Sequence, residues 1–540
     1  MSTNYTDAKN YGKQFFSGVA ILAISTFIVK IIGLFYKIPM MLYLGAEGMG
    51  YFNSAYDIYS LFFVIATTGI PVAISILVSE NKAQGRIKNI KKIYTMSLVV
   101  LGSLGFVGTL ILFLFHGELA ELIRNDLATS SILAISPTLF LICISSAIRG
   151  YFQGNQMMLP TAISQVIEAV GKLLLGLGFA IIALNKGYSI PRVASYATLG
   201  LTLSIALSLL FLILFKLFYK IKNAHECFTS TDSNISITKQ LLKIAIPITL
   251  SSTILSLTKI IDMTMILRRL NDIGYSQEQA NSVYGAYSTM AVSIYNLPAT
   301  LVSAIALPLV PMLAASIETK DAEKERSVMS SSLKLTALIG FPAGLGISVF
   351  SKPILSLLFS SQEKEIEYVA PLLSLLGLSI FLASMITITN AILQSYQLVN
   401  KPIISMIVGT VVKVITSYLL IGNERINIYG APISTFFSVA VIVSINLFYI
   451  IKRTRKFTSV YHLFIKPFIS SLISIICGLG LYMILYSFVS TTMLILSTIL
   501  FVTIIYVLTI LKLKVIDENE ICMLPQGNKL LKLLQKIKLI

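Results

Sequence analysis

The stretch VASYATLGLTLSIALSLLFLILF, residues 193–215, decides the fold class because its 23 residues include no charged side chain. A helix needs about 20 predominantly apolar residues to cross the hydrocarbon core of a bilayer. Runs of this kind recur along the 540 residues, of which 56% are apolar and 12% are charged. Soluble domains carry about 25% charged residues. The composition therefore predicts an integral membrane protein and excludes a soluble enzyme with a single anchor.

Continuous apolar runs separated by polar or turn residues predict about fourteen spanning helices. These runs cover residues 15–41, 56–79, 93–115, 128–148, 160–184, 193–215, 244–267, 284–313, 335–351, 368–393, 402–421, 430–451, 467–489 and 493–511. Strands of an outer-membrane barrel would instead alternate over about 10 residues. We therefore expect an all-α membrane protein.

The net charge of +18 follows the predicted connections. Of the 42 basic residues, 29 fall on the N-terminal side of the membrane, 8 on the opposite side and five inside the spans. By the positive-inside rule, both termini are cytoplasmic and the protein lies in the cytoplasmic membrane. The charge is thus a topology signal, and we expect no nucleic-acid partner. The first run contains Lys30 and has no clear cleavage site after it, so we expect an uncleaved helix.

The four cysteines have no C-x-x-C spacing, so we expect no disulfide, no metal site and no cofactor. In the tail from Asn528 to Ile540, four lysines alternate with Leu and Ile at helical spacing. This pattern is typical of an amphipathic helix on an anionic membrane surface, with an ordinary solubilising tail as the alternative.

An internal repeat divides the chain. A shift of 241 residues superposes FQGNQ (152–156) on LQSYQ (393–397), Ser164 on Ser405 and Lys172 on Lys413. Six helices separate the copies, so we expect two parallel lobes related by an axis along the membrane normal and enclosing a central cavity. The expected parts are an N-lobe (1–222), a cytoplasmic linker (223–240), a C-lobe (241–451), two extra spans (452–511) and a cytoplasmic tail (512–540).

Five lysines lie inside predicted spans: Lys30, Lys37, Lys172, Lys259 and Lys413. A charge near the bilayer centre costs about 2.5–3.5 kcal/mol and usually faces a bundle interior or a water-filled cavity. Helical spacing puts Glu168 beside Lys172 and Asp262 beside Lys259, so mutual neutralisation is one reading of these pairs. Lys30 and Lys37 share one stripe of the first helix, although Lys37 could instead reach the interface.

Lysines projecting from both lobes would make a cationic cavity suited to a phosphate or pyrophosphate. Arg149 closes the fourth predicted span, either as a first contact for an anionic headgroup or as an ordinary cytoplasmic charge. Asp57 and Glu80 bound the second predicted span, and we expect both at the membrane interface. Asp262 and Glu168 are the candidate proton or cation carriers.

Several segments resemble one transporter family. They are KIIG (30–33), GAEGMG (45–50), TGIPVAIS (68–75), IRGYFQG (148–154), and PTAISQ (160–165) followed by Glu168. This set is similar to the stage V sporulation protein B and polysaccharide-transport branch of the multidrug/oligosaccharidyl-lipid/polysaccharide exporter superfamily, which includes lipid II flippases. The resemblance implies flipping of undecaprenyl-pyrophosphate-linked sugars, with lipid II the leading candidate. It also implies that Lys30 matches a basic first-helix position of those flippases.

Two other functions compete with a flippase. A multidrug antiporter for cationic substrates would favour acids in the cavity, whereas the lysines expected to be buried in the spans outnumber the acids expected to be buried there, Glu168 and Asp262, by five to two. A membrane-embedded glycan polymerase or prenyl transferase would need paired acids, and no Asp-Asp pair occurs. The sequence has no G-x-x-x-x-G-K-[ST] motif, so we expect the membrane potential or a coupled ion to supply energy. The sequence therefore favours a transporter of an anionic lipid-linked glycan that is not an enzyme.

Overall fold

The computed structural model describes residues 3–218, 232–454 and 461–515, and within these ranges the chain is helical with no strand. The contacts divide the chain into two compact units: Met1–Thr289 with Ile421–Ile428, and Met290–Leu420 with Tyr429–Ile540. This division falls after Thr289, whereas the lobes expected from the repeat meet at residues 223–240. Residues 223–231 of that linker and the basic tail helix lie outside the described residues, and the lobes stay a prediction.

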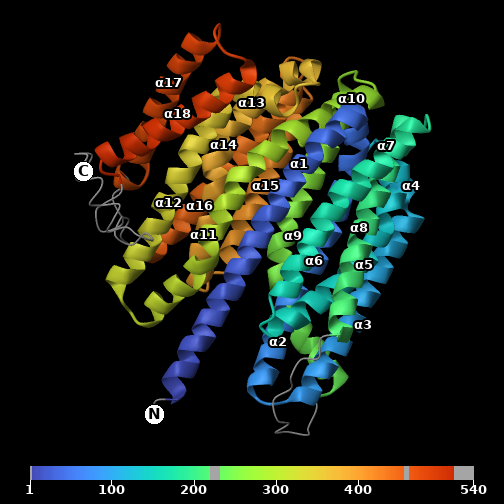
Figure 1. The fold of residues 1–540 in the computed structure, drawn as a ribbon, viewed down its shortest axis with the longest axis vertical. Helices are drawn as coiled ribbons and strands as arrows, with labels where there is room; N and C mark the ends of the chain where they lie inside the picture. The colour runs from blue at the N-terminus through green and yellow to red at the C-terminus, as the bar shows by residue number, and fades with distance from the viewer. Residues whose placement is uncertain (1–2, 219–231, 455–460, 516–540) are drawn as a thin grey trace. The chain divides into compact units, whose positions relative to one another are not determined.

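The first unit consists of long helices joined by short turns (Figure 1). Its elements are α1 (Thr3–Thr67), α2 (Gly69–Ala83), α3 (Ile87–Leu114), α4 (His116–Leu122), η1 (Asp126–Ala128), α5 (Thr129–Gly154), α6 (Leu159–Gly171), η2 (Lys172–Gly176), α7 (Leu177–Asn185), α8 (Ile190–Phe218), α9 (Asn234–Asp272) and α10 (Gln277–Ala286). The π-helical turn η3 (Tyr287–Val292) contains the boundary between the units.

The second unit repeats this pattern of long helices and short turns. Its elements are α11 (Ser293–Glu318), α12 (Ala322–Val349), α13 (Ser351–Leu358), α14 (Glu363–Ser395), α15 (Asn400–Ile421), α16 (Gly430–Thr454), η5 (Tyr461–Ile465), α17 (Lys466–Leu485) and α18 (Thr491–Lys512). The short turn η4 (Asn427–Tyr429) contains a second boundary between the units. Within it, α14 packs against α11, α12 and α16, and the α17–α18 pair packs against α12.

Helix α1 is a hairpin of two helices, because the backbone leaves helical geometry at Gly45 (φ 66°, ψ −177°). The positive φ is a conformation that glycine adopts without a Cβ clash. The rings of Tyr36 and Phe52, on the two arms, lie 6.1 Å apart. The second arm then runs to Thr67, so it returns toward the end of the unit where the chain begins (Figure 1).

Twelve helices of the described chain are long and apolar enough to cross a membrane. One of them, Ile24–Lys82, is 59 residues long and contains the α1 hairpin and α2, so it covers two predicted spans. The predicted span 284–313 falls on α10, η3 and α11, which are not among the twelve. The prediction of an all-α, multi-span membrane protein is confirmed.

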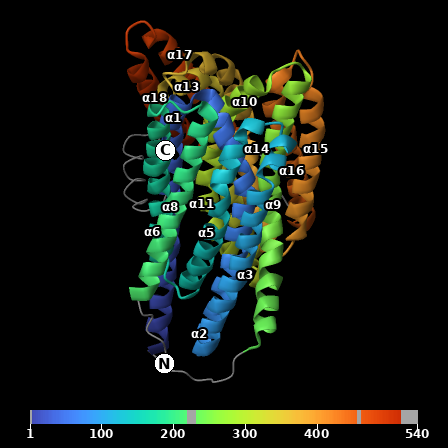
Figure 2. The same ribbon diagram turned by 90° about the vertical axis from the view of Figure 1, so that its right-hand side faces the viewer.

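Close packing at glycines sets the spacing of helices in the first unit. Helix α5 lies against α1, α2, α3 and α8, and α9 runs beside α2 and α3 (Figure 2). A Cβ on Gly69 would lie 2.2 Å from Thr249 Oγ1 of α9, and one on Gly150 would lie 2.9 Å from the Pro71 carbonyl oxygen of α2. Side chains at these positions would therefore push α9 or α5 away from α2.

The two copies of the sequence repeat form the same turn. Gln156 and Gln397 have left-handed φ values of 64° and 60°, two residues after the last residues of α5 and α14. The backbone N–H groups of Gln156 and Gln397 each donate to the carbonyl oxygen three residues earlier in the chain. The N–H group of the next residue donates to the carbonyl oxygen five residues earlier, and all four distances are 2.9 Å. This pattern is the Schellman motif that satisfies the last carbonyls of a helix. Each half thus has a long helix, an identical turn and a shorter helix that begins at Leu159 or Asn400.

Candidate functional site

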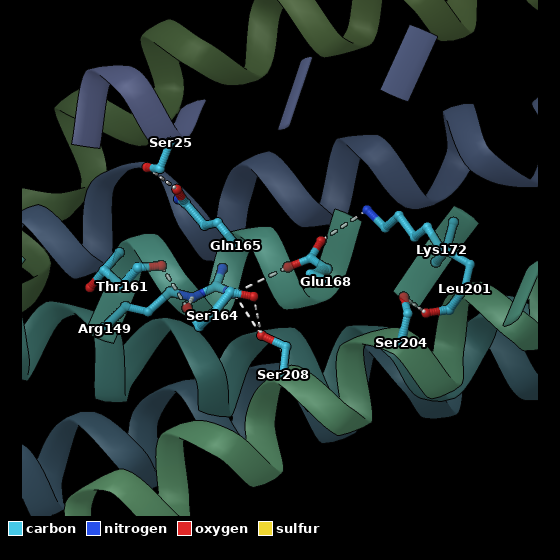
Figure 3. Close-up of polar contacts among 10 residues, drawn as sticks. All are labelled: Ser25, Arg149, Thr161, Ser164, Gln165, Glu168, Lys172, Leu201, Ser204 and Ser208. Carbon is cyan, nitrogen blue, oxygen red and sulfur yellow. Dashed lines mark hydrogen bonds and ion pairs between the residues drawn. The ribbon is translucent and has the colours of Figure 1, made fainter. Parts of the chain in front are cut away.

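The buried guanidinium of Arg149, on α5, organises a polar cluster inside the first unit (Figure 3). Its Nε donates to Ser164 Oγ at 3.0 Å, and its Nη2 donates to Glu168 Oε2 and Ser208 Oγ, each at 3.1 Å. These acceptors lie on α6 and α8, so one side chain connects three helices. We call Arg149, Ser164, Glu168, Lys172 and Ser208 the charged cluster.

Glu168 is shared by two cations. Its Oε2 accepts from Arg149, and its Oε1 accepts from Lys172 Nζ at 2.9 Å. The side chains of Arg149 and Glu168 are 8% and 9% exposed, and that of Lys172 is 20% exposed. Both carboxylate oxygens therefore accept from positively charged groups, and the cluster carries a net charge of +1.

Sequence reasoning found part of this cluster. The pairing of Glu168 with Lys172 was expected from their four-residue spacing and is present. Arg149 was expected either as a first headgroup contact or as an ordinary cytoplasmic charge; the structure buries it, since α5 continues to Gly154 and the Schellman turn brings α6 back alongside it, and its role stays a prediction. The sequence indicated Ser164 only as a position of the internal repeat. It did not indicate Ser208, because nothing in the apolar pattern of α8 distinguishes one serine from the others.

A second group of charges gathers around the α1 hairpin. The charges of Asp57, Lys259 and Lys30 act on Lys37, and those of Lys259, Lys37 and Asp262 act on Asp57. Lys30 and Lys259 are exposed, whereas Lys37, Asp57 and Asp262 are half-buried. The structure thus brings together three of the predicted lysines and one predicted acid. We call these five residues the lysine group.

Asp57 is the correction within this group. It was expected at the interface, but it lies twelve residues beyond the Gly45 turn, about 18 Å along the second arm of α1. Tyr284 of α10 donates to its Oδ2 at 2.5 Å. No sequence signal connects two residues that are 227 positions apart, so Tyr284 was missed. Glu80 is exposed near the end of α2, and its expected place at the membrane interface stays a prediction.

Lys413 lies on α15 in the second unit and is 5% exposed. Elsewhere in this unit, the amide of Asn446 on α16 donates to Asn390 Oδ1 at 2.8 Å and to Thr389 Oγ1 at 3.0 Å, and its oxygen accepts from Ser405 Oγ at 2.7 Å. We call Thr389, Asn390, Ser405 and Asn446 the amide cluster. It joins α14, α15 and α16 through neutral groups.

The GAEGMG segment packs its turn directly against α10. A Cβ on Gly50 would lie 2.4 Å from Asn281, and one on Gly285 would lie 2.0 Å from the Ala46 carbonyl oxygen. The Asn281 amide donates to the Glu47 carbonyl oxygen at 2.8 Å. Gly50 of this segment and Gly285 of α10 therefore permit contact between two backbones.

Comparison of the sequence with known proteins identifies a family and two relatives. Residues 15–317 match the family model described as polysaccharide biosynthesis protein, and residues 281–419 match the MatE model. Stage V sporulation protein B of Bacillus subtilis (strain 168) is 26% identical over 424 residues, covering 78% of this chain and 80% of the relative. Lipid II flippase MurJ of the same organism is 26% identical over 421 residues, covering 75% and 77%.

A solved structure has a similar fold. The structure described as lipid II flippase MurJ in an inward closed conformation superposes with a TM-score of 0.67 at 16% identity, covering 91% of this chain and 98% of that one. Fold and matches define a multi-span transporter of the multidrug/oligosaccharidyl-lipid/polysaccharide exporter superfamily. The chain belongs to the polysaccharide biosynthesis protein family, in its branch with MurJ and stage V sporulation protein B. This is a family of transporters, so the prediction that the protein is not an enzyme is confirmed.

Proposed function

We propose that the protein flips an undecaprenyl-pyrophosphate-linked oligosaccharide, either lipid II or a related cell-envelope glycan precursor, across the cytoplasmic membrane by alternating access. The lysine group carries this proposal, because its three lysines outnumber its two carboxylates. An excess of positive charge at a membrane-embedded site favours an anionic headgroup. The name of one relative, a lipid II flippase, supports the same substrate class.

In this proposal the basic residues bind the pyrophosphate while the prenyl tail stays in the lipid. The proposed substrate-binding residues are Lys30, Lys37, Lys172, Lys259, Lys413 and Arg149. Both termini are cytoplasmic, as the distribution of basic loops suggests. Lys172 and Arg149 are engaged by Glu168 in the described structure, so a substrate that reached them would compete with that carboxylate.

Energy is proposed to come from the membrane potential or from a coupled proton or cation. Asp262 and Glu168 are the proposed ion-coupling residues. The two acids differ in their surroundings, since Glu168 already contacts two cations whereas half-buried Asp262 belongs to the more exposed lysine group. A coupling cation at Glu168 would have to displace an ammonium or a guanidinium, and this difference favours Asp262.

The proposal is tested by replacing the essential lipid II flippase of a depletable bacterial strain with this gene. We expect the wild type to sustain growth, Lys30→Ala and Lys413→Ala to reduce it, and Lys186→Ala, an exposed loop lysine, to match the wild type. Failure of the wild type despite membrane expression would count against lipid II. Full growth with both span variants would overturn the role of the lysines.

The second candidate is a multidrug antiporter of the same superfamily, favoured by the MatE match over residues 281–419. Such a protein would bind organic cations, which the positive charge excess of the lysine group opposes. Efflux of ethidium from cells that express the protein distinguishes the two functions. Efflux above that of an empty vector would favour the antiporter.

A further inference from the structure

Asp232, two residues before the start of α9, is held by the turn between α2 and α3. Its carboxylate accepts from the side-chain amide of Asn89 at 3.0 Å, and its backbone N–H donates to Asn89 Oδ1 at 3.1 Å. Lys92 Nζ donates to its carbonyl oxygen at 2.5 Å, and Arg86 Nη1 lies 3.9 Å from its carboxylate. Asp232 is thus bound through its side chain and both backbone groups. We call Arg86, Asn89, Lys92 and Asp232 the α9 clamp.

The two sides of this clamp keep hydrogen bonds of their own. Asn89 is 1% exposed, and its amide also donates to Asn81 Oδ1 at 2.7 Å. Helix α9 begins without help from Asp232, because the hydroxyl of Ser233 accepts from the N–H of its first turn. Separation of Asp232 from Asn89 therefore leaves the turn and the helix start intact.

Helix α3 also holds the end of α8. The ammonium of Lys216 on α8 lies 2.9 Å from the ring centroid of Tyr94 on α3 and 5.2 Å from that of Tyr151 on α5. The chain between Lys216 and Asp232 leads from the predicted N-lobe into the predicted linker. Both of its ends are therefore attached to the first turns of α3, one by a cation over aromatic rings and one by hydrogen bonds of a half-buried aspartate.

Helix α9 belongs to different halves by sequence and by contact. The internal repeat assigns it, from residue 241 onward, to the C-lobe, whereas it packs against α1, α2 and α3 in the first unit. Alternating access moves one lobe of such a transporter relative to the other. Opening at the end where α9 begins and α2 ends (Figure 2) therefore requires α9 to leave α2 and α3.

We propose that the α9 clamp is a latch that closes the protein toward the cytoplasm, and that release of Asp232 from Asn89 lets α9 separate from α2. This inference rests on the proposed function, from which it takes alternating access and the cytoplasmic position of this end. Deeper in the unit, a Cβ on Gly69 of α2 would clash with the Ala245 carbonyl oxygen of α9, so backbones meet there without an interlocking side chain. The clamp supplies directional bonds, which exchange with water at small net cost.

A purely structural role makes a different prediction. If Asp232 only stabilises the start of α9, its replacement lets the first turn fray, as loss of the Ser233 cap would, and deeper residues of α9 stay closed. If the clamp is a latch, replacement of Asp232 exposes α9 along its contact with α2, and Ser233→Ala does not. Accessibility deep in α9 therefore separates the two roles.

The reporter for this test is Ala245→Cys, in the full chain with its four native cysteines replaced by serine. Ala245 is 2% exposed and lies eleven residues after the first residue of α9, about 17 Å along the helix. The measurement is the rate at which a membrane-impermeant maleimide labels this thiol in inverted membrane vesicles. Only separation of α9 from α2 on the cytoplasmic side should expose it.

We expect Asp232→Ala to raise the labelling rate about tenfold, because the loss of a hydrogen bond to a charged group shifts an equilibrium by about that factor. Two control variants should label at the rate of the reporter chain alone. Ser233→Ala removes the neighbouring cap, and Lys216→Met removes the other attachment to α3. Asn89→Ser breaks the same pair from the other side if Asp232→Ala does not fold.

The outcomes separate the latch from the proposed substrate. An unchanged rate in Asp232→Ala overturns the latch, and so does an equal rise in either control variant, since that is general loosening. Faster labelling only in right-side-out vesicles overturns its cytoplasmic assignment. No substrate takes part in this assay, so a raised rate in a protein that fails to replace the lipid II flippase supports the latch and counts against lipid II.

Discussion

The charged cluster of the first unit and the amide cluster of the second occupy corresponding places in the repeat, yet they hold their helices together by different chemistry. A shift of 241 residues replaces Arg149 by Asn390 and Glu168 by Gly409, and retains a serine as Ser405. The first cluster joins its helices through ion pairs at 2.9–3.1 Å, and the second through amide and hydroxyl hydrogen bonds at 2.7–3.0 Å. The same helix and turn framework thus supports either solution.

Packing explains why the second cluster has no carboxylate at the position of Glu168. A Cβ on Gly409 would lie 2.2 Å from Cγ1 of Ile442, and the hydroxyl of Ser438 donates to the Gly409 carbonyl oxygen at 2.8 Å. Helix α16 therefore lies directly against α15 at this point. An acid would force the two helices apart, so the corresponding helices retain only the lysine, as Lys413.

Removing the shared carboxylate should have the largest effect. Glu168→Ala leaves buried Arg149 and half-buried Lys172 without their anion, which we expect to cost about 3–5 kcal/mol of stability. The measurement is a melting curve in detergent. Unfolding is monitored with a fluorogenic reagent that reacts with the buried thiol of Cys143 when this thiol becomes exposed. The other three cysteines, Cys227, Cys477 and Cys522, are replaced by serine in all variants. Glu278→Ala, an exposed acid, is the control, and equal melting of both variants would contradict the prediction.

Introducing the missing cation into the second unit is the converse change. Asn390→Arg places a guanidinium where Gly409 cannot supply a carboxylate, so we expect a cost of about 2.5–3.5 kcal/mol. The same melting assay compares it with Asn390→Gln, which keeps the amide. If Asn390→Arg melts as Asn390→Gln does, the second framework accepts a charge without a partner, and the argument from Gly409 fails.

A conservative change tests whether geometry or charge holds the first cluster together. Arg149→Lys keeps the charge but loses the planar arrangement by which Nε and Nη2 reach Ser164, Glu168 and Ser208. We expect about 2 kcal/mol of destabilisation, since hydrogen bonds between charged groups contribute about 1.5–3 kcal/mol. The exposed Arg192→Lys is the control. A melting temperature unchanged in Arg149→Lys would show that charge alone suffices.

The sequence predicts those parts of the two clusters that local periodicity controls. The spans follow from apolar runs, and the Glu168–Lys172 pair follows from a four-residue spacing on one helix. Arg149 could not be assigned to Glu168, because their contact depends on a Schellman turn that reverses the chain between them. The Tyr284–Asp57 contact depends on how α10 crosses the α1 hairpin, and no local pattern encodes that crossing.

The smallest effect should come from the neutral cluster. Asn446→Leu removes an amide that bonds Thr389, Asn390 and Ser405, but these groups can find other partners, so interhelical hydrogen bonds in membranes contribute only about 0.6–1.7 kcal/mol. In the melting assay we expect a shift within this range. Combining the change with Ser405→Ala should add little, because the serine has already lost its bond to Asn446. A loss of stability as large as that of Glu168→Ala would mean that the amide cluster stabilises its unit as much as the charged cluster stabilises the first. The two clusters would then differ in their chemistry but not in their contribution to stability.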